Sequence, residues 1–521
     1  MRSDHSKKTG MFPNRYHTFW AVLSGVLLAL SYPTFDLNIL AWFALVPLLY
    51  ALFSSPSLYH SYLLGLLTGM SGIVVGFYWI AHWASNALEI PLPFNLLFLL
   101  GFAFCFGQVF GIITLLSAWI KRYSNISEVF IFPIVLVSVF SVFPLLFRFS
   151  LADGQWQFLT AIQPIDITGI WGLDFVMALS NSLIFYLCFS PAESKNKYLL
   201  IVSMSIICFW FITGWFKLNI WDEKVFHGQI KKIGIVQPNR TAVLSKPKPL
   251  PGYSREYPLE MQLSETLKEQ DVDLLIWPEG HFFGYSFWSD VRKSFRQTIG
   301  KWKTPLVFYD ATRRNTEKGE KAYNTIHFLN EKGELKARYD KIKLVPFSEY
   351  LPLLDKWALF DWILGDYLDN LTPGNEAKIV PLAGMKLVPK VCYEPLFPEF
   401  VAETIGDEGA GKVLVVQSQD GWFGETSQPF QHMAVTVMRA VENRVPLVHV
   451  IQNGPSGIIH PNGRFAFLSK PFIKGSWVAE MSFSPNNGGS FFSRFPNLFL
   501  NIIRLFCLLL LVESFIRRRV R

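Results

Sequence analysis

The chain has 521 residues, of which 51% are apolar, 16% aromatic and only 17% charged. Soluble globular domains carry about 25% charged residues, and disordered chains are rich in charge and poor in aromatic residues. The composition therefore excludes a fully soluble protein and a disordered one. The net charge of +8 lies in basic clusters beside apolar runs, a pattern of membrane topology, so we expect no nucleic-acid partner.

Charge is unevenly distributed along the chain. Between Tyr16 and Ile120 the only Asp, Glu, Lys or Arg residues are Asp36 and Glu89, whereas charges return at an ordinary density from Asp222 to about Asn487. The sequence therefore predicts a membrane block joined to a soluble block.

Eight apolar runs of the membrane block are candidates for spans, since a bilayer core of about 30 Å needs about 20 mainly apolar helical residues. Trp and Tyr gather at the ends of several runs, as interfacial anchors do. In chain order the expected spans are Phe19–Tyr32, Ile39–Phe53, Tyr62–Trp83, Leu97–Trp119, Val129–Phe147, Trp171–Leu187, Leu199–Phe216 and Pro496–Ile516.

The basic clusters predict the topology, because Lys and Arg are retained on the cytoplasmic side. Seven spans place the soluble block outside the cytoplasm, and the eighth returns the basic tail, so both termini are expected in the cytoplasm. The predicted domains are residues 1–218, 219–492 and 493–521. Arg504 lies within the last span, where we expect it to snorkel toward an interface. The clusters are Arg2/Lys7/Lys8/Arg15, Lys121/Arg122, Lys195/Lys197 and Arg517/Arg518/Arg519/Arg521.

The soluble block alternates short β-rich apolar runs with helical stretches, which favours a layered α/β sandwich. Helical periodicity marks Tyr257–Glu269 and Ser427–Asn443, and Pro461-Asn462-Gly463 is a hairpin signal. Expected strands are Lys232–Val236, Asp273–Trp277, Pro305–Tyr309, Thr325–Leu329, Met385–Val391, Lys412–Val416, Leu447–Ile451, Ile458–His460 and Phe465–Phe467.

Cys392 is the one cysteine of the soluble block, while the other four lie in or beside apolar runs. It ends an expected strand and precedes a possible helix, whose N-terminus would lower the pKa of the thiol. From position alone, Cys392 is either a nucleophile or a buried structural cysteine. No GxGxxG, P-loop or zinc-ligand spacing is present, so we expect neither a cofactor nor a metal.

A nucleophilic thiol needs a base and a group that stabilises the oxyanion. Glu279 follows an expected strand and is a candidate base, although a solvated loop acid is equally compatible with its position. Lys341 and Lys343 are candidate cations, and would share a face if their stretch were a strand; otherwise they form an exposed basic face. Glu349 is a further acid nearby.

Three motifs occur in one order: Trp277-Pro278-Glu279, Tyr339-Asp340-Lys341 with Leu344 to Glu349, and Val391-Cys392-Tyr393-Glu394. The set resembles the Glu–Lys–Cys triad of the carbon–nitrogen hydrolase (nitrilase) superfamily. With eight spans, the whole chain resembles the apolipoprotein N-acyltransferase family of the bacterial inner membrane. The resemblance implies a nitrilase-like αββα sandwich on the periplasmic side, inserted before the last span.

The resemblance also implies a two-step acyl transfer without a cofactor. Cys392 would take the sn-1 acyl chain of a phospholipid as a thioester and pass it to the α-amine of an S-diacylglyceryl-cysteine apolipoprotein, with membrane lipids around both. Glu279 would be the general base, and Lys341 would stabilise the oxyanion with the backbone N–H of Tyr393. Glu349 would hold Lys341 or Glu279, and Tyr393 and Glu394 would shape the site.

Some residues depart from the family pattern. Ala242–Ser254 lacks the expected Trp, Gly280 replaces Thr or Ser after the acid, and Gln419 and Gly421 replace Asn and Ala beside Asp420. We interpret His432 as structural rather than as a Cys–His partner.

Two apolar segments, His281–Trp288 and Trp357–Leu368, are candidate lids that dip into the membrane interface; ordinary core packing is the alternative. Two other functions remain open. A membrane-tethered amidohydrolase would carry the same triad with water as the acceptor, and a non-catalytic scaffold for another membrane enzyme would not need an intact triad.

Overall fold

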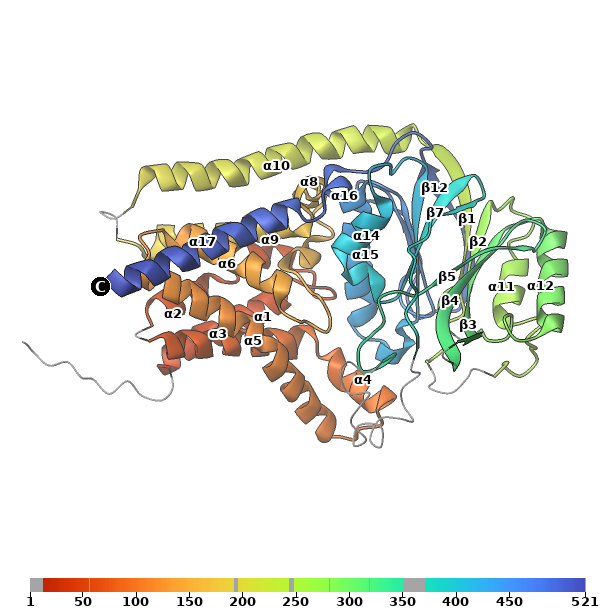
Figure 1. Ribbon diagram of the computed structural model, residues 1–521, viewed down its shortest axis with the longest axis horizontal. Coiled ribbons are helices and arrows are strands. Elements are labelled where there is room, and N and C mark those ends of the chain that lie inside the picture. Colours follow the sequence, from red (N-terminus) through yellow and green to blue (C-terminus); the bar gives the residue numbers. More distant parts are fainter. Residues whose placement is uncertain are drawn as a thin grey trace, which may run out of the picture.

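The computed structural model describes residues 13–55, 57–191, 195–242, 248–280, 282–317, 319–350 and 371–520. A helical bundle forms one end of the molecule and a sandwich of two sheets forms the other, with α14 (Pro398–Ile405) and α15 (Gln428–Asn443) between them (Figure 1). The composition break in the sequence therefore corresponds to a physical division of the molecule.

Apolar helices build the bundle. Within the described ranges, five of them are long and apolar enough to cross a membrane, while α1, α2 and α6 are shorter. The helices are α1 (Arg15–Ala29), α2 (Val46–Phe53), α3 (Leu58–Gly76), α4 (Trp79–Ala87), α5 (Phe94–Tyr123), α6 (Glu128–Val142), α9 (Ile170–Phe189), α10 (Lys197–Phe226) and α17 (Leu498–Val520).

One expected span is two helices. The run Tyr62–Trp83 breaks after Gly76, and α4 contacts the sandwich, where the ring of Trp79 meets that of Phe423 edge-on at 5.0 Å. Arg504 also differs from the expectation of snorkelling: its Nε donates to Ser141 Oγ at 3.0 Å and its Nη2 to the Ser141 carbonyl at 3.1 Å. The last turn of α6 supplies these acceptors, so the guanidinium is satisfied within the protein.

Small residues let the bundle helices approach closely. A Cβ built on Gly69 of α3 would come 2.6 Å from the carbonyl oxygen of Gly107 on α5, which is too close for any side chain. Small residues at such crossings allow the backbone packing that drives helix association in lipid.

The sandwich consists of two six-stranded sheets whose orders are β12-β1-β2-β3-β4-β5 and β11-β10-β9-β8-β7-β6. The central pairs β1–β2, β2–β3, β7–β8 and β8–β9 are parallel. The strands are β1 (Gln229–Gln237), β2 (Leu274–Ile276), β3 (Leu306–Thr316), β4 (Gly319–Leu329), β5 (Leu335–Asp340), β6 (Val380–Leu382), β7 (Met385–Val391), β8 (Lys412–Ser418), β9 (Leu447–Ile451), β10 (Gly457–Ile459), β11 (Phe465–Leu468) and β12 (Gly475–Phe483).

Alternation along the strands creates the layers. Val413 and Val415 of β8 face the core between the sheets, whereas Leu414 and Val416 face the opposite side, as the period of two requires. Helices α11 (Leu259–Glu265) and α12 (Ser289–Trp302) cover the first sheet. Helices α14 (Pro398–Ile405) and α15 (Gln428–Asn443) cover the second, which confirms the αββα sandwich.

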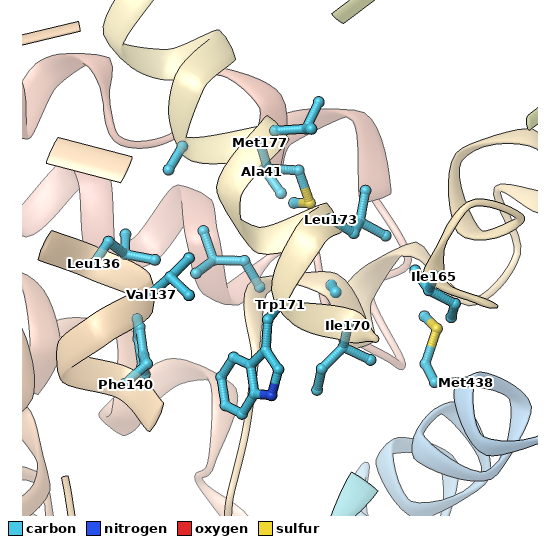
Figure 2. Close-up of a cluster of buried hydrophobic side chains, with 14 of the residues drawn as sticks. Ala41, Leu136, Val137, Phe140, Ile165, Ile170, Trp171, Leu173, Met177 and Met438 are labelled. Carbon is cyan, nitrogen blue, oxygen red and sulfur yellow. The ribbon is translucent and has the colours of Figure 1, made fainter. Parts of the chain in front are cut away.

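Helices α14 and α15, which cover the second sheet, also pack against the bundle. One apolar core runs from the bundle to α15, and Met438 of α15 lies beside Ile165 in Figure 2. Membrane bundle and sandwich therefore share a core rather than meeting at a wet surface.

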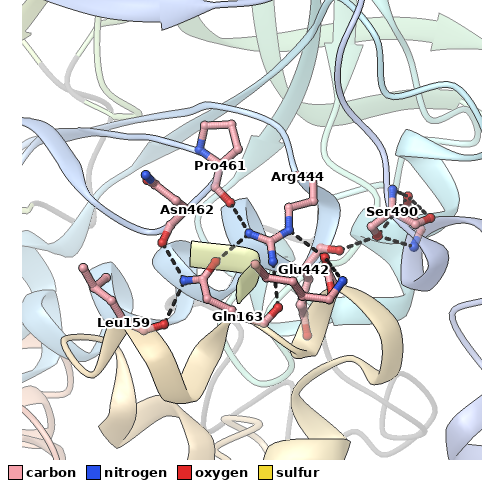
Figure 3. A network of polar contacts seen from close by, with 10 residues as sticks. Leu159, Gln163, Glu442, Arg444, Pro461, Asn462 and Ser490 are labelled. Carbon is pink, nitrogen blue, oxygen red and sulfur yellow. Dashed lines mark hydrogen bonds and ion pairs between the residues drawn. The ribbon is translucent and has the colours of Figure 1, made fainter. Parts of the chain in front are cut away.

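Polar contacts fix the same junction around Arg444, which ends α15 (Figure 3). Its Nε donates to Asp166 Oδ2 at 2.8 Å, its Nη1 to Gln163 Oε1 at 2.8 Å and its Nη2 to the Gln163 carbonyl at 2.7 Å. Lys217 of α10 lies 2.9 Å from the same Asp166. A single acid of the bundle thus holds two cations.

Candidate active site

The three candidate triad residues come after three strands. Glu279 comes three residues after the end of β2, while Lys341 and Cys392 come directly after β5 and β7. The acid and the lysine belong to the first sheet and the thiol to the second. Side chains beyond the carboxyl ends of strands gather at one place in α/β folds, and here the three side chains interact with one another. We call the place between the two sheets where they meet the crevice.

Lys341 lies between two carboxylates. Its Nζ donates to Glu349 Oε1 at 2.9 Å and is 4.0 Å from Glu279 Oε1, and the residue is only 1% exposed. Burial alone would lower the pKa of the ammonium, but Glu349 and Glu279 outweigh it and the pKa is raised. Lys341 therefore stays a cation over the whole physiological range.

Glu279 is buried and hydrogen-bonded at both oxygens. Asn324 Nδ2 donates to Oε1 at 2.6 Å, and the backbone N–H of Gln419 donates to Oε2 at 3.1 Å. Burial raises its pKa, and the opposing effect of Lys341 does not cancel that rise. A carboxylate with raised proton affinity is suited to accept a proton.

Glu349 is anchored on the lysine loop, the segment from Lys341 to Tyr350. Its Oε2 accepts the backbone N–H of Val345 at 2.8 Å, and Asn324 Nδ2 lies 3.4 Å from its Oε1. Asn324 thus bridges the two carboxylates. Sequence reasoning gave Asn324 no role.

Cys392 lies at a strained turn, with a left-handed φ of 47°. Its backbone N–H donates to the Gln417 carbonyl at 2.9 Å, which ties the turn to β8. The expected lowering of the thiol pKa is wrong: burial and, after it, Glu279 raise the pKa, and Lys341 opposes them only partly. The chain continues from Cys392 into a short 3-10 turn, Glu394–Leu396, rather than into a helix with a strong dipole. The thiol therefore needs a base.

Glu394 is fully buried and joins the two halves of the site. Its Oε2 accepts the N–H of Val391 at 2.7 Å, and its Oε1 accepts the N–H groups of Ile342 at 2.8 Å and Lys343 at 3.2 Å. The same Oε1 accepts the hydroxyl of Tyr339 at 2.7 Å. One carboxylate therefore sets the Cys392 turn against the Lys341 loop.

Tyr393 is held by the bundle. Its hydroxyl donates to the carbonyl of Leu146, and its ring lies 6.3 Å from Phe147 and 5.1 Å from Phe397. The turn that carries the thiol is thus attached to the loop after α6, which places the crevice next to the membrane block.

Lys341 and Lys343 do not share a strand face, because β5 ends at Asp340. Lys341 is buried, whereas Lys343 is partly exposed, with its Nζ 5.6 Å from the ring centre of Phe397. The two lysines therefore have separate surroundings.

His432 pairs with Asp420 rather than with the thiol: its Nδ1 lies 3.0 Å from Asp420 Oδ2. Although burial acts in the opposite sense on each group, their mutual attraction prevails, lowering the pKa of Asp420 and raising that of His432. The pair lies in the core beside the Cys392 turn.

Two of the departures from the family pattern are in contact. A Cβ on Gly280 would lie 2.9 Å from Gln419 Nε2, and the φ of Gly280 is +82°. The long Gln419 side chain therefore fills the space that a side chain at position 280 would need, while its Oε1 accepts the N–H of Gly421 at 3.0 Å.

Of the two expected lids, the whole of Trp357–Leu368 and the first residue of the other, His281, lie outside the described residues. In the rest of His281–Trp288, Asp310 anchors the loop by accepting the N–H groups of Gly284 at 2.9 Å and Ser286 at 2.6 Å. Phe282 packs in the core with Trp277, so this part of the segment includes core packing.

Two family models match the chain. Residues 24–183 match the apolipoprotein N-acyltransferase N-terminal domain, and residues 254–484 match the carbon–nitrogen hydrolase family. Relatives named apolipoprotein N-acyltransferase include one from Geobacter metallireducens, 28% identical over 92% of this chain and 91% of its own length. Another, from Bdellovibrio bacteriovorus, is 27% identical over 90% and 88%.

Solved structures similar to the sandwich include an amidase from Nesterenkonia, with a TM-score of 0.36 and 20% identity over 52% of this chain and 96% of that one. A carbon–nitrogen hydrolase from Helicobacter pylori has a TM-score of 0.36 and 16% identity, over 49% and 90%. Both family models and the full-length relatives agree: the chain is a bacterial membrane enzyme that belongs to the apolipoprotein N-acyltransferase family.

Proposed function

We propose that the protein transfers the sn-1 acyl chain of a phospholipid, through a thioester on Cys392, to the N-terminal α-amine of diacylated apolipoproteins. The observation that carries the residue assignment is the arrangement of three side chains: Glu279 Oε1 lies 4.0 Å from Lys341 Nζ, and Cys392, directly after β7, is within electrostatic reach of both. The substrates are the lipid and the lipoprotein that the family name implies.

In the first step, Glu279 takes the proton of the Cys392 thiol as the sulfur attacks the ester carbonyl. The oxyanion that forms is stabilised by Lys341, which stays protonated, with the N–H of Tyr393 as a second donor. Collapse of the tetrahedral intermediate breaks the ester C–O bond. The glycerol oxygen takes the proton from Glu279, and lysophospholipid leaves.

In the second step, the α-amine of the apolipoprotein attacks the thioester carbonyl, and Glu279 takes the proton that the amine loses. Collapse of this intermediate breaks the C–S bond, forms the amide and returns the proton to the thiolate. Glu349 holds Lys341 in place during both steps through their 2.9 Å contact. The phospholipid and the apolipoprotein are the only reactants that the two steps need.

The proposed orientation places the sandwich, residues 219–492, on the periplasmic side, with the bundle at residues 1–218 and 493–521. It is supported by the basic residues in the last turn of α5, Lys121 and Arg122, and by Arg517–Arg519 in that of α17. The C-terminus lies at the end of the bundle away from the sandwich (Figure 1). Both lipid substrates would then reach the crevice from the outer leaflet.

Intact-protein mass spectrometry after incubation with phospholipid tests the reaction. We expect wild type to gain the mass of one fatty-acyl chain and Cys392→Ala to gain none, and added apolipoprotein to remove the adduct as it becomes triacylated. If wild type gains no adduct and the apolipoprotein stays diacylated, the proposal is wrong.

A thiol reagent that cannot cross the inner membrane tests the orientation. In intact spheroplasts it should label Cys392 if the sandwich faces outward. Since four other cysteines are present, the labelling is compared with that of Cys392→Ala. Labelling of Cys392 only after lysis would reverse the proposed topology.

A further inference from the structure

A cluster of cations and aromatic rings lies beside the crevice and is not used by the proposed chemistry. We call Arg148, Lys343, Lys390, Phe397 and Phe400 the cation–aromatic cluster. Arg148 Cζ lies 4.7 Å and Lys343 Nζ 5.6 Å from the ring centre of Phe397. Lys343 Nζ and Lys390 Nζ lie 5.3 and 3.7 Å from that of Phe400.

Positive charge exceeds negative charge in this cluster. Glu399 Oε2 forms an ion pair with Arg148 Nη1 at 3.7 Å, longer than a hydrogen bond, and Glu399 Oε1 accepts the indole N–H of Trp171 at 2.9 Å. Glu394 is engaged by backbone N–H groups, and Lys390 donates to the neutral hydroxyl of Thr404 at 2.8 Å. Arg504 adds a further positive charge near Arg148 and Glu399.

The two accessible cations come from opposite blocks of the molecule and share the ring of Phe397. Lys343 is two residues from Lys341 on the lysine loop, and Arg148 is on the loop that comes after α6 of the bundle, with its side chain 39% exposed. Tyr393, the neighbour of Cys392, packs its ring 5.1 Å from that of Phe397. The cluster therefore lies at the junction of bundle and sandwich, beside the turn that carries the thiol.

We propose that Arg148 and Lys343 form a subsite for the phosphodiester of the phospholipid donor, an inference that rests on the proposed function. Arg offers a planar fork for phosphate oxygens and Lys a mobile point charge, and basic groups at a membrane surface recognise lipid head groups. The ester to be cleaved and the phosphate are joined by a glycerol backbone, so a phosphate held here keeps the sn-1 ester near Cys392.

Apolar groups around the cations favour a lipid over a free anion. The rings of Phe397 and Phe400 lie under the charges, and Phe347 on the lysine loop is 49% exposed. Val142 at the end of α6 is 65% exposed. A lipid satisfies both halves of this surface, with its phosphate on the cations and its glycerol and upper chains on the apolar groups.

Acylation of the full-length protein by two donors of the same fatty acid tests the subsite. One donor is the phospholipid and the other is a p-nitrophenyl ester, which has no phosphate. For Arg148→Gln and Lys343→Gln we expect the phospholipid concentration for half-maximal acylation to rise about tenfold, as for a lost hydrogen bond to a charged group. Acylation by the p-nitrophenyl ester should stay as in wild type.

Two further variants complete the test. Lys332→Gln removes an exposed lysine in the β4–β5 turn and should behave as wild type with both donors, and Arg148→Lys should lose less than Arg148→Gln. Equal losses with both donors, or none with the phospholipid, would overturn the subsite. Wild type that accepts only the p-nitrophenyl ester would instead overturn the proposed function.

Discussion

Two buried ion clusters of this molecule have opposite charge ratios. In the crevice, one cation, Lys341, serves two carboxylates, those of Glu349 and Glu279. At the junction of bundle and sandwich, one carboxylate, that of Asp166, serves two cations, Arg444 and Lys217. Both clusters are buried and hydrogen-bonded, so burial alone does not distinguish a reactive cluster from a structural one.

The ratio explains the difference. Where acids outnumber cations, burial and, after it, the like charge of Glu349 leave one carboxylate, Glu279, with a raised pKa, and it gains affinity for a proton. Where cations outnumber acids, the carboxylate of Asp166 is paired with cations on both sides, Arg444 at 2.8 Å and Lys217 at 2.9 Å. The first cluster is therefore suited to proton transfer and the second to fixing one block on the other.

The largest effect is expected for Cys392→Ala, which removes the proposed nucleophile beside Glu279, Lys341 and Glu349. We call these three residues the acid-rich cluster. Turnover should fall by at least about 10⁴-fold, as for the loss of a catalytic nucleophile, and is measured by conversion of diacylated to triacylated apolipoprotein. Cys208→Ala, in α10, is the matched control and should keep wild-type turnover. Comparable losses in both variants would mean that thiol removal acts on the fold.

Glu279→Gln keeps an oxygen for Asn324 but removes the base. We expect the rate of acylation to fall about 10²- to 10⁴-fold. Because burial raises the pKa of Glu279, the carboxylate loses its proton only above the ordinary carboxyl range, so the wild-type rate should rise with pH there. The variant should lack this rise, and a pH profile that keeps it would assign the base to another group.

Arg444→Gln tests the cation-rich cluster, which consists of Asp166, Arg444 and Lys217. Removing one partner of a buried, hydrogen-bonded pair costs about 3–5 kcal/mol, and we expect this in the free energy of unfolding of the detergent-solubilised protein. The acylation rate per folded molecule should stay unchanged. Arg464→Gln is the matched control, since its pair with Asp222 is partly exposed and exposed pairs contribute about 0–1 kcal/mol. A catalytic loss without destabilisation would contradict the division between the clusters.

Much of this architecture was predictable from the sequence. Apolar length located most of the helices, and short apolar runs located β1, β7, β8 and β9, because buried parallel strands are nearly continuous apolar runs. Strands β6 and β12 and helix α12 were among the elements that were missed. Only Val291, Phe295 and Ile299 of α12 face the core, and charged or polar residues surround them in the sequence. Three apolar residues among so many polar ones did not stand out as an amphipathic helix.

The site was predicted less completely than the fold. The ordered motifs brought Glu279, Lys341 and Cys392 into one hypothesis, and the structure brings them together. The sign of the thiol pKa shift was wrong, because it depends on burial between two sheets rather than on the local turn. The resemblance implied that Glu394 shapes the site, but it did not give the contacts. The hydrogen bonds of Asn324 and Glu394 join segments far apart in the sequence, and a pattern along one chain segment does not contain them.

The smallest effect is expected for Glu394→Gln, which alters how the two sheets meet without touching the reacting atoms. Its Oε2 accepts the N–H of Val391 at 2.7 Å. A glutamine whose oxygen still accepts the N–H of Ile342 would turn its N–H₂ group toward the N–H of Val391. Two donors would then face each other, so the Cys392 turn must shift against the Lys341 loop. Loss of one hydrogen bond to a charged group is about 1.5–3 kcal/mol, which corresponds to an acylation rate about tenfold or more below wild type.

Three measurements separate this positioning role from a loss of fold. The phospholipid concentration for half-maximal acylation should stay unchanged, because the Glu394 carboxylate is engaged by backbone N–H groups and not by the side chains of Arg148 and Lys343. Glu394→Asp should recover part of the rate, since it restores an acceptor for Val391. The rise of the rate with pH should also persist, because Glu279 is intact. A variant that lost that rise would mean that Glu394 takes part in proton transfer, and the acid-rich cluster would then extend into the second sheet.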